Sequence, residues 1–196
     1  MKYSIRQPKT DDIRKALYEE GKHGHYHISG HQLEQQGDEY VELRNIVFKC
    51  DKDYIIDAPE YDNLKDGTWY ERNYEPLITL QLPKAIDKLI ADNDTRQAII
   101  QFYDSEMQDR TDMICTMYVS LRLRIMTNTT PVLTYTVHMR SSDVREFRSD
   151  LKWHKKVLNL IMKDLSEKYQ RPVWAEPIIW YADSIQCWDK DWEFLK

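Results

Sequence analysis

The chain has 196 residues and a formal net charge of −5, so it can bury one core as a single domain and lacks the basic field of a general nucleic-acid binder. Its three cysteines, Cys50, Cys115 and Cys187, match no zinc or disulfide spacing, which predicts a reducing, cytoplasmic location. No apolar run approaches the roughly 20 residues of a membrane span and no leader segment is recognisable, so we expect no membrane contact.

The first predicted element is a helix that Thr10 caps and Gly21 ends. It is followed by a histidine cluster, made of His23, His25, His27 and His31. Extended backbone there would place three imidazoles on one face, as in a metal site, whereas the glycine-punctuated polar sequence is more typical of a surface loop. With no cysteine or fixed second shell beside the cluster, we expect the loop and assign no metal ligand.

The segment Tyr40 to Ile56 predicts one or two strands broken at Asp51 to Asp53, with Cys50 as a small buried side chain. A loop follows from Asp57 to Thr68, rich in residues that favour turns. The next stretch, Trp69 to Leu82, is aromatic and mixed in charge, and we expect its Pro76 to prevent one uninterrupted helix.

Pro83 fits the first position of a helix that carries Ile86, Leu89 and Ile90 and closes near Asn93. A strand is predicted next, over Ala98 to Tyr103. Arg96 lies at the entrance of that strand, where burial statistics favour a surface charge over a ligand-binding role.

The clearest pattern is a pair of alternating strands that form a hairpin. The first places Met113, Cys115, Met117 and Val119 on one apolar face, and the second runs from Leu133 to Met139. The second strand leads into the sequence Arg140-Ser141-Ser142-Asp143. The Cys115 thiol is therefore expected to lie near this polar group.

Ser149 or Asp150 is predicted to begin the longest helix, which has a broad apolar stripe that includes His154 and Leu160. A last strand is predicted over Pro177 to Trp188, broken near Asp183, and a short segment with Trp192 and Phe194 follows it. Together these elements predict an α+β fold with a mostly antiparallel or mixed sheet packed on a long central helix.

Chemistry alone leaves two interpretations of Cys115 open. It begins a strand beside a polar loop, where the Arg140 cation of the neighbouring strand would stabilise a nucleophilic thiolate. A buried structural cysteine explains the same position equally well. All five glycines lie at or before Gly67, so any phosphate bound later in the chain must be held by arginine and serine side chains or by a helix N-terminus.

Four segments together resemble the thymidylate synthase superfamily, most closely the bacteriophage deoxycytidylate (dCMP) hydroxymethylases. They are DNDTRQAII, DMICTMYVSLRLR, TVHMRSSDVREFRSDLKWHKKVL and PIIWYADSIQCWDKDWEFL. They cover about half of the chain, from Asp94 to Leu195. The resemblance implies a single thymidylate synthase-like domain over residues 1–196, a homodimer, a pyrimidine deoxynucleotide monophosphate substrate and 5,10-methylenetetrahydrofolate as one-carbon donor.

The resemblance also implies roles for individual residues. Cys115 would attack C6 of the base, and Arg140 with Ser141 would bind the 5′-phosphate together with Arg96 of the partner subunit. Asp143 would orient the base through backbone contacts. Asp150 falls where the family selects cytosine over uracil, although an N-cap of the long helix explains it equally well.

Several positions depart from the family pattern. Glu146 replaces a glycine, and Gln186 and Trp188 stand where a histidine and a tyrosine hold the sugar hydroxyl. The family's catalytic glutamate aligns with Asn73, flanked by Glu71 and Glu75, and we assign its role to Glu75. The segment between Leu77 and Asp94 is short, so the folate pocket is expected to be truncated. A catalytically inactive homologue that binds a nucleotide or acts as a scaffold therefore stands beside the C5 hydroxymethylase or methylase.

Overall fold

The computed structural model describes residues 10–22, 27–28, 39–50, 67–103, 114–125, 130–144 and 146–188. Its helices are α1 (Thr10–Lys22), α2 (Gly67–Asn73), α3 (Glu75–Ala91) and α4 (Phe147–Tyr169). Its strands are β1 (His27–Ile28), β2 (Glu39–Cys50), β3 (Ile99–Gln101), β4 (Thr116–Arg124), β5 (Val132–Met139), β6 (Ser142–Asp143), β7 (Trp174–Ala175) and β8 (Ile178–Trp188). No described helix has the length and apolar character that crossing a bilayer requires.

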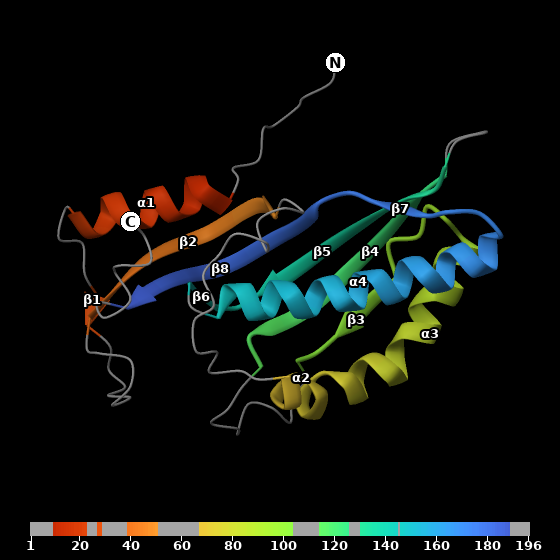
Figure 1. The fold of residues 1–196 in the computed structure, drawn as a ribbon, viewed down its shortest axis with the longest axis horizontal. Helices are drawn as coiled ribbons and strands as arrows, with labels where there is room; N and C mark the ends of the chain where they lie inside the picture. The colour runs from red at the N-terminus through yellow and green to blue at the C-terminus, as the bar shows by residue number, and fades with distance from the viewer. Residues whose placement is uncertain are drawn as a thin grey trace, which may run out of the picture.

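The described strands form one mixed sheet in the order β1-β2-β8-β5-β4-β3, with β6 added to β8 and β7 to β5. Antiparallel pairs build both sides of the sheet, and the parallel pair β5 and β8 joins them. A parallel pair needs a long crossover connection, which α4 supplies by running across one face of the sheet (Figure 1). The predicted α+β architecture is confirmed.

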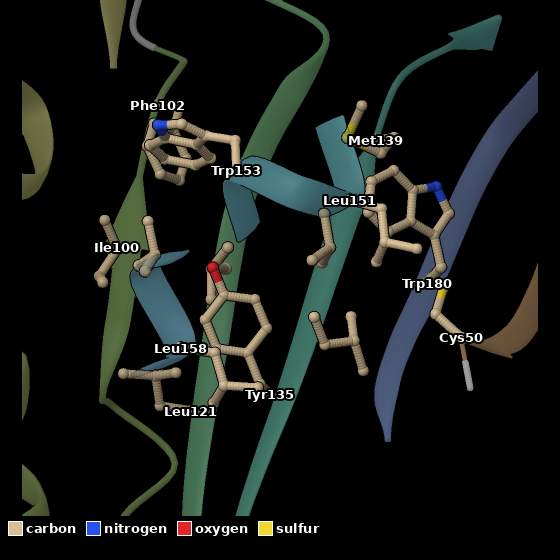
Figure 2. Packing of buried hydrophobic residues seen from close by; sticks show 14 of the residues in the cluster. Cys50, Ile100, Phe102, Leu121, Tyr135, Met139, Leu151, Trp153, Leu158 and Trp180 are labelled. Atoms are coloured by element: carbon tan, nitrogen blue, oxygen red, sulfur yellow. The ribbon is translucent and has the colours of Figure 1, made fainter. Parts of the chain in front are cut away.

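The core lies between α4 and the sheet. Leu151 and Leu158 of the helix are buried near Trp180 of β8 and Tyr135 of β5, respectively, whereas Trp153 packs against Phe102, just after β3 (Figure 2). The apolar periodicity of α4 therefore specifies the face that packs, and burial of that face is the main stabilising term. Leu160, which was predicted in the same stripe, is instead exposed.

The helical region before β3 corrects one prediction. Pro76 occupies the first turn of α3, where a missing N–H costs little, so the interruption expected there is confirmed. Pro83 does not begin a helix: it lies exposed inside α3. The buried face of α3 continues through this point from Ile78 and Leu82 to Ile86, so core packing outweighs the local cost of the proline.

Two further boundaries differ from the sequence-based expectation. β8 is continuous through Asp183, which lies exposed beside the pair Arg44 and Ser184. Asn45 on the facing strand has a positive φ of 54°, a conformation that asparagine tolerates. The irregular backbone conformation in this region therefore occurs at Asn45 of β2, and β8 is not interrupted.

The N-terminal predictions fall partly outside the described residues. The helix expected from Thr10 is confirmed as α1, and Cys50 is buried as expected. α1 lies alongside β2, at the edge of the sheet opposite α2 and α3 (Figure 1). His27 begins β1, whereas His23, His25, His31 and the segment after Trp188 lie outside the described residues.

Candidate functional site

A β-bulge at the start of β4 decides where Cys115 lies. Thr116 pairs with Met139 but Tyr118 pairs with His138, so β4 carries one additional residue, Met117. The added residue shifts the alternation, and Thr116 rather than Cys115 faces the core. The prediction that Cys115 and Met117 share the buried face of Val119 is therefore wrong, and Cys115 is only half-buried.

The half-buried thiol contacts the polar segment that follows β5. The Ser141 hydroxyl donates to the Cys115 Sγ at 3.6 Å, and the Arg140 backbone N–H donates to the Cys115 carbonyl oxygen at 2.9 Å. Both contacts join Cys115, just before β4, to residues just after the end of β5. The structure thus places thiol, serine and arginine together, as the hairpin pattern predicted.

Strand β6 connects this group to the end of β8. Asp143 pairs with Gln186, and the Val144 N–H donates to the Gln186 carbonyl oxygen at 3.0 Å. Trp188 is buried, and its ring contacts Tyr40 of β2 with centroids 5.0 Å apart. The backbone of Asp143 therefore lies beside Gln186, two residues before Trp188 on β8.

Glu146, where the sequence resemblance predicted a glycine, is the N-cap residue directly before α4. Glu146 has φ −83° and ψ −20°, ordinary helical values that require no glycine, and its side chain is buried. α4 starts at Phe147, not at Ser149 or Asp150 as predicted. Asp150 consequently lies within the first turn and is not the N-cap of the helix.

Asp150 is 2% exposed and accepts a hydrogen bond from the Tyr70 hydroxyl, with 2.6 Å between Oη and Oδ1. Burial, and then the charge of Asp150, raise the pKa of Tyr70 well above its usual value. Tyr70 therefore keeps its proton and acts as a permanent donor. Tyr70 was not among the predicted site residues, although its spacing of four residues from Tyr74, which lies between α2 and α3, brings the two rings into contact.

Removing the Tyr70 hydroxyl is expected to destabilise the fold. Tyr70→Phe leaves the buried Asp150 without this donor, which costs about 1.5–3 kcal/mol for a hydrogen bond to a charged group. Urea unfolding measures the loss. Tyr169→Phe is the matched control, because Tyr169 donates to a backbone carbonyl at 3.3 Å in a half-buried position and should lose less. Equal losses for the two variants would contradict the assigned importance of the Asp150 contact.

A second buried polar chain lies behind the thiol strand. The Thr116 hydroxyl is 3.1 Å from the Tyr74 hydroxyl and 3.3 Å from the His154 Nε2, and the His154 Nδ1 is 2.9 Å from the Tyr135 hydroxyl. Burial raises the pKa of both tyrosines. His154, which was counted in the apolar stripe of α4, thus contacts the protonated Tyr135 phenol directly and the Tyr74 phenol through Thr116.

Two predicted site residues lie apart from this group. Glu75 forms an ion pair with Lys156 of α4 at 3.0 Å and is half-exposed, while Arg96 is exposed in the loop between α3 and β3. The Asn73 side chain donates to the Trp69 carbonyl oxygen, and Glu71 is exposed. In the region around Asn73, where a catalytic acid was expected, the buried side chains are those of Tyr70 and Tyr74 and not those of carboxylates.

A histidine on the other face of β5 predicts a pH-dependent stability. His138 stacks on Tyr118 with centroids 4.0 Å apart, and burial lowers the pKa of His138 despite the opposing effect of Asp183. The folded state therefore binds this proton less well than the unfolded chain, and stability falls as pH drops from about 6.5 through the folded pKa. Urea midpoints between pH 7.5 and 5 should fall less steeply for His138→Phe, and parallel profiles would contradict the prediction.

No family model matches the sequence, and no curated protein sequence matches it either. Among solved structures, thymidylate synthase from T4 phage is similar with a TM-score of 0.65 at 13% sequence identity, covering 93% of this chain and 77% of that one. At this identity the likeness establishes the architecture. It agrees with the resemblance inferred from the sequence at the level of the fold. The chain therefore has a thymidylate synthase-like fold.

Proposed function

We propose that the protein binds a pyrimidine deoxynucleotide monophosphate and activates its base through covalent addition of Cys115. The contact between the Ser141 hydroxyl and the Cys115 Sγ carries this proposal, because it joins a half-exposed thiol to the segment that holds Arg140 and Ser141, residue types suited to binding a phosphate. The thymidylate synthase-like fold supports the same conclusion.

The chemistry of the first step follows from the base. The Cys115 thiolate forms a bond to C6, and the electrons of the C5=C6 double bond move onto C5 and the exocyclic position at C4. Water then protonates C5. Loss of the original C5 proton and expulsion of the thiolate restore the double bond, so the base exchanges hydrogen with solvent without any other reactant. A one-carbon electrophile would intercept the same activated carbon.

The remaining roles are assigned by position. Arg140 and Ser141 bind the 5′-phosphate, and in a homodimer the exposed Arg96 does so from the partner subunit. Asp143 orients the base through its backbone. Sedimentation of the protein as a monomer at micromolar concentration would exclude the role of Arg96.

Base choice is assigned to Asp150, whose carboxylate accepts hydrogen bonds as the cytosine amino group requires. Its contact with Tyr70 keeps one oxygen fixed. The sugar hydroxyl is assigned to Gln186 and Trp188. We do not assign a proton-transfer role to Glu75, because its ion pair with Lys156 holds it at the surface.

The fit to 5,10-methylenetetrahydrofolate is poor in the described residues. A folate requires planar apolar surface, yet the chain carries no aromatic residue from Glu75 to Ala98, and α3 runs almost directly into β3. The aromatic residues just before this stretch, Tyr70 and Tyr74, are buried in the core. We therefore derive no step through the cofactor.

Tritium release tests the proposal. The protein is incubated with dCMP or dUMP tritiated at C5, with and without methylenetetrahydrofolate, and binding of each nucleotide is measured in parallel. Cofactor-independent release from dCMP above that from dUMP is expected, since Asp150 favours cytosine. Binding of a nucleotide without release would support the second candidate, a catalytically inactive binding homologue, which the surface position of Glu75 favours. Absence of both binding and release would refute the proposal.

A further inference from the structure

Strands β2 and β8 lie side by side and carry a chain of polar side chains, of which the proposed function gives a role to Gln186 alone (Figure 1). The Gln186 Nε2 donates to the Ser184 Oγ at 3.0 Å, and the Ser184 hydroxyl donates to the Glu42 Oε1 at 2.5 Å. The Arg44 Nε donates to the other oxygen of Glu42 at 2.6 Å. The Glu42 side chain is only 7% exposed, so water competes little for these contacts.

The positions of the protons in this chain follow from the residue types. A carboxylate paired with an arginine can only accept hydrogen bonds, so the single proton of Ser184 must be directed to Glu42. The Ser184 oxygen can then only accept. Gln186 must consequently turn its NH₂ group toward Ser184, which leaves its carbonyl oxygen on the opposite side of the amide.

We propose that Glu42 and Ser184 are positioning residues that fix the side-chain amide of Gln186, so that it offers an acceptor to the sugar of the bound nucleotide. This inference rests on the proposed function, which assigns Gln186 to the sugar hydroxyl. The amide of an isolated glutamine can turn over and offer either a donor or an acceptor. Here, Glu42 and Ser184 determine which way the amide of Gln186 is turned.

The place of Gln186 in the fold agrees with this role. Its backbone pairs with Asp143 of β6, and Ser141, two residues earlier, contacts the Cys115 thiol. The backbone of Gln186 therefore lies beside the segment whose Ser141 contacts the sulfur. Arg44 at the far end of the chain is largely exposed and stabilises the ionised form of Glu42 from the solvent side.

A fixed acceptor has a consequence for the class of ligand. A free 3′-hydroxyl can donate to it, whereas a 3′-phosphate or the phosphodiester of a polynucleotide offers only acceptors and leaves the carbonyl unpaired. The site is thus specific for mononucleotides with a free 3′-hydroxyl. Discrimination against a nucleotide without that hydroxyl should amount to roughly threefold to tenfold in Kd, as expected for one net hydrogen bond.

Calorimetric titration with dCMP and with 2′,3′-dideoxycytidine 5′-monophosphate tests the inference. The ratio of the two dissociation constants is the readout, because a purely structural defect weakens both ligands alike and leaves the ratio unchanged. Ser184→Ala and Glu42→Leu each free the amide of Gln186 to turn, so both should lower the ratio, because the 3′-hydroxyl no longer meets an acceptor that is held in place. Ser184→Ala removes a single hydroxyl and keeps the test available should the other variant not fold.

The chain offers a matched control at the opposite end of the sheet. Glu176 accepts a hydrogen bond from the Thr134 hydroxyl at 2.7 Å and forms an ion pair with Arg124 at 3.4 Å, so a glutamate again joins a hydroxyl to an arginine. Glu176→Leu should keep the wild-type ratio. A wild-type ratio in Ser184→Ala and Glu42→Leu, or equal affinities in the unmodified protein, would overturn the inference alone. A wild-type protein that binds neither nucleotide would overturn the proposed function with it.

Discussion

Cys115→Ser is expected to lower tritium release from C5-tritiated dCMP by about 10,000-fold or more, which is the scale of loss when a nucleophile is removed. A hydroxyl at this position carries almost no anion at neutral pH and cannot add to C6 at a comparable rate. The Ser141 hydroxyl, which contacts the sulfur, cannot replace it, since it carries the same weakly acidic group.

Cys50→Ala is the control for this variant. Cys50 is buried at the end of β2, where it pairs with Ile178, so its thiol has no access to a nucleotide near Cys115. Release should stay within a few-fold of the unmodified protein. Both variants should bind dCMP with similar affinity, because the phosphate contacts assigned to Arg140 and Ser141 are unchanged. Undiminished release from Cys115→Ser would exclude covalent addition by this residue.

Trp180→Ala is expected to cost about 3–5 kcal/mol of unfolding free energy, the range measured when large aromatic side chains are truncated in cores. Trp180 is 0% exposed and packs against Phe147 of α4 with ring centroids 5.0 Å apart. The truncated side chain leaves a cavity between the central helix and β8. Because domains are stable by roughly 5–15 kcal/mol, the variant should lose a large part of its free energy of unfolding, as measured in urea.

Two substitutions make this result specific. Trp180→Phe should lose less than Trp180→Ala, because it keeps an aromatic ring and removes an indole N–H that has no hydrogen-bond partner among the described residues. Trp174→Ala should change stability by no more than about 0.5 kcal/mol, since Trp174 is 60% exposed. Comparable losses at positions 174 and 180 would contradict the assignment of Trp180 to the core.

The sequence predicted the secondary structure near the thiol because local patterns determine it. Alternation of apolar residues predicted β4 and β5, the broad apolar stripe predicted α4, and continuity of the chain after β5 predicted that Arg140 and Ser141 would lie near Cys115. These inferences require only the periods of a strand and a helix and a short connection between neighbouring strands. Such inferences do not depend on which elements pack against the strands and the helix.

The tertiary structure decided which side chains face the core and which distant residues meet. The bulge at Met117 turned Thr116 inward, and the buried face of α3 overrode the local preference of Pro83. Tyr70 meets Asp150 across 80 residues of sequence, and Ser184 meets Glu42 across 142. Such pairs form because burial penalises any polar group that lacks a partner, a penalty that depends on the packed neighbours and not on local sequence. The sequence by itself thus determined the fold class and the thiol beside the arginine and serine, while packing alone decided which buried groups support them.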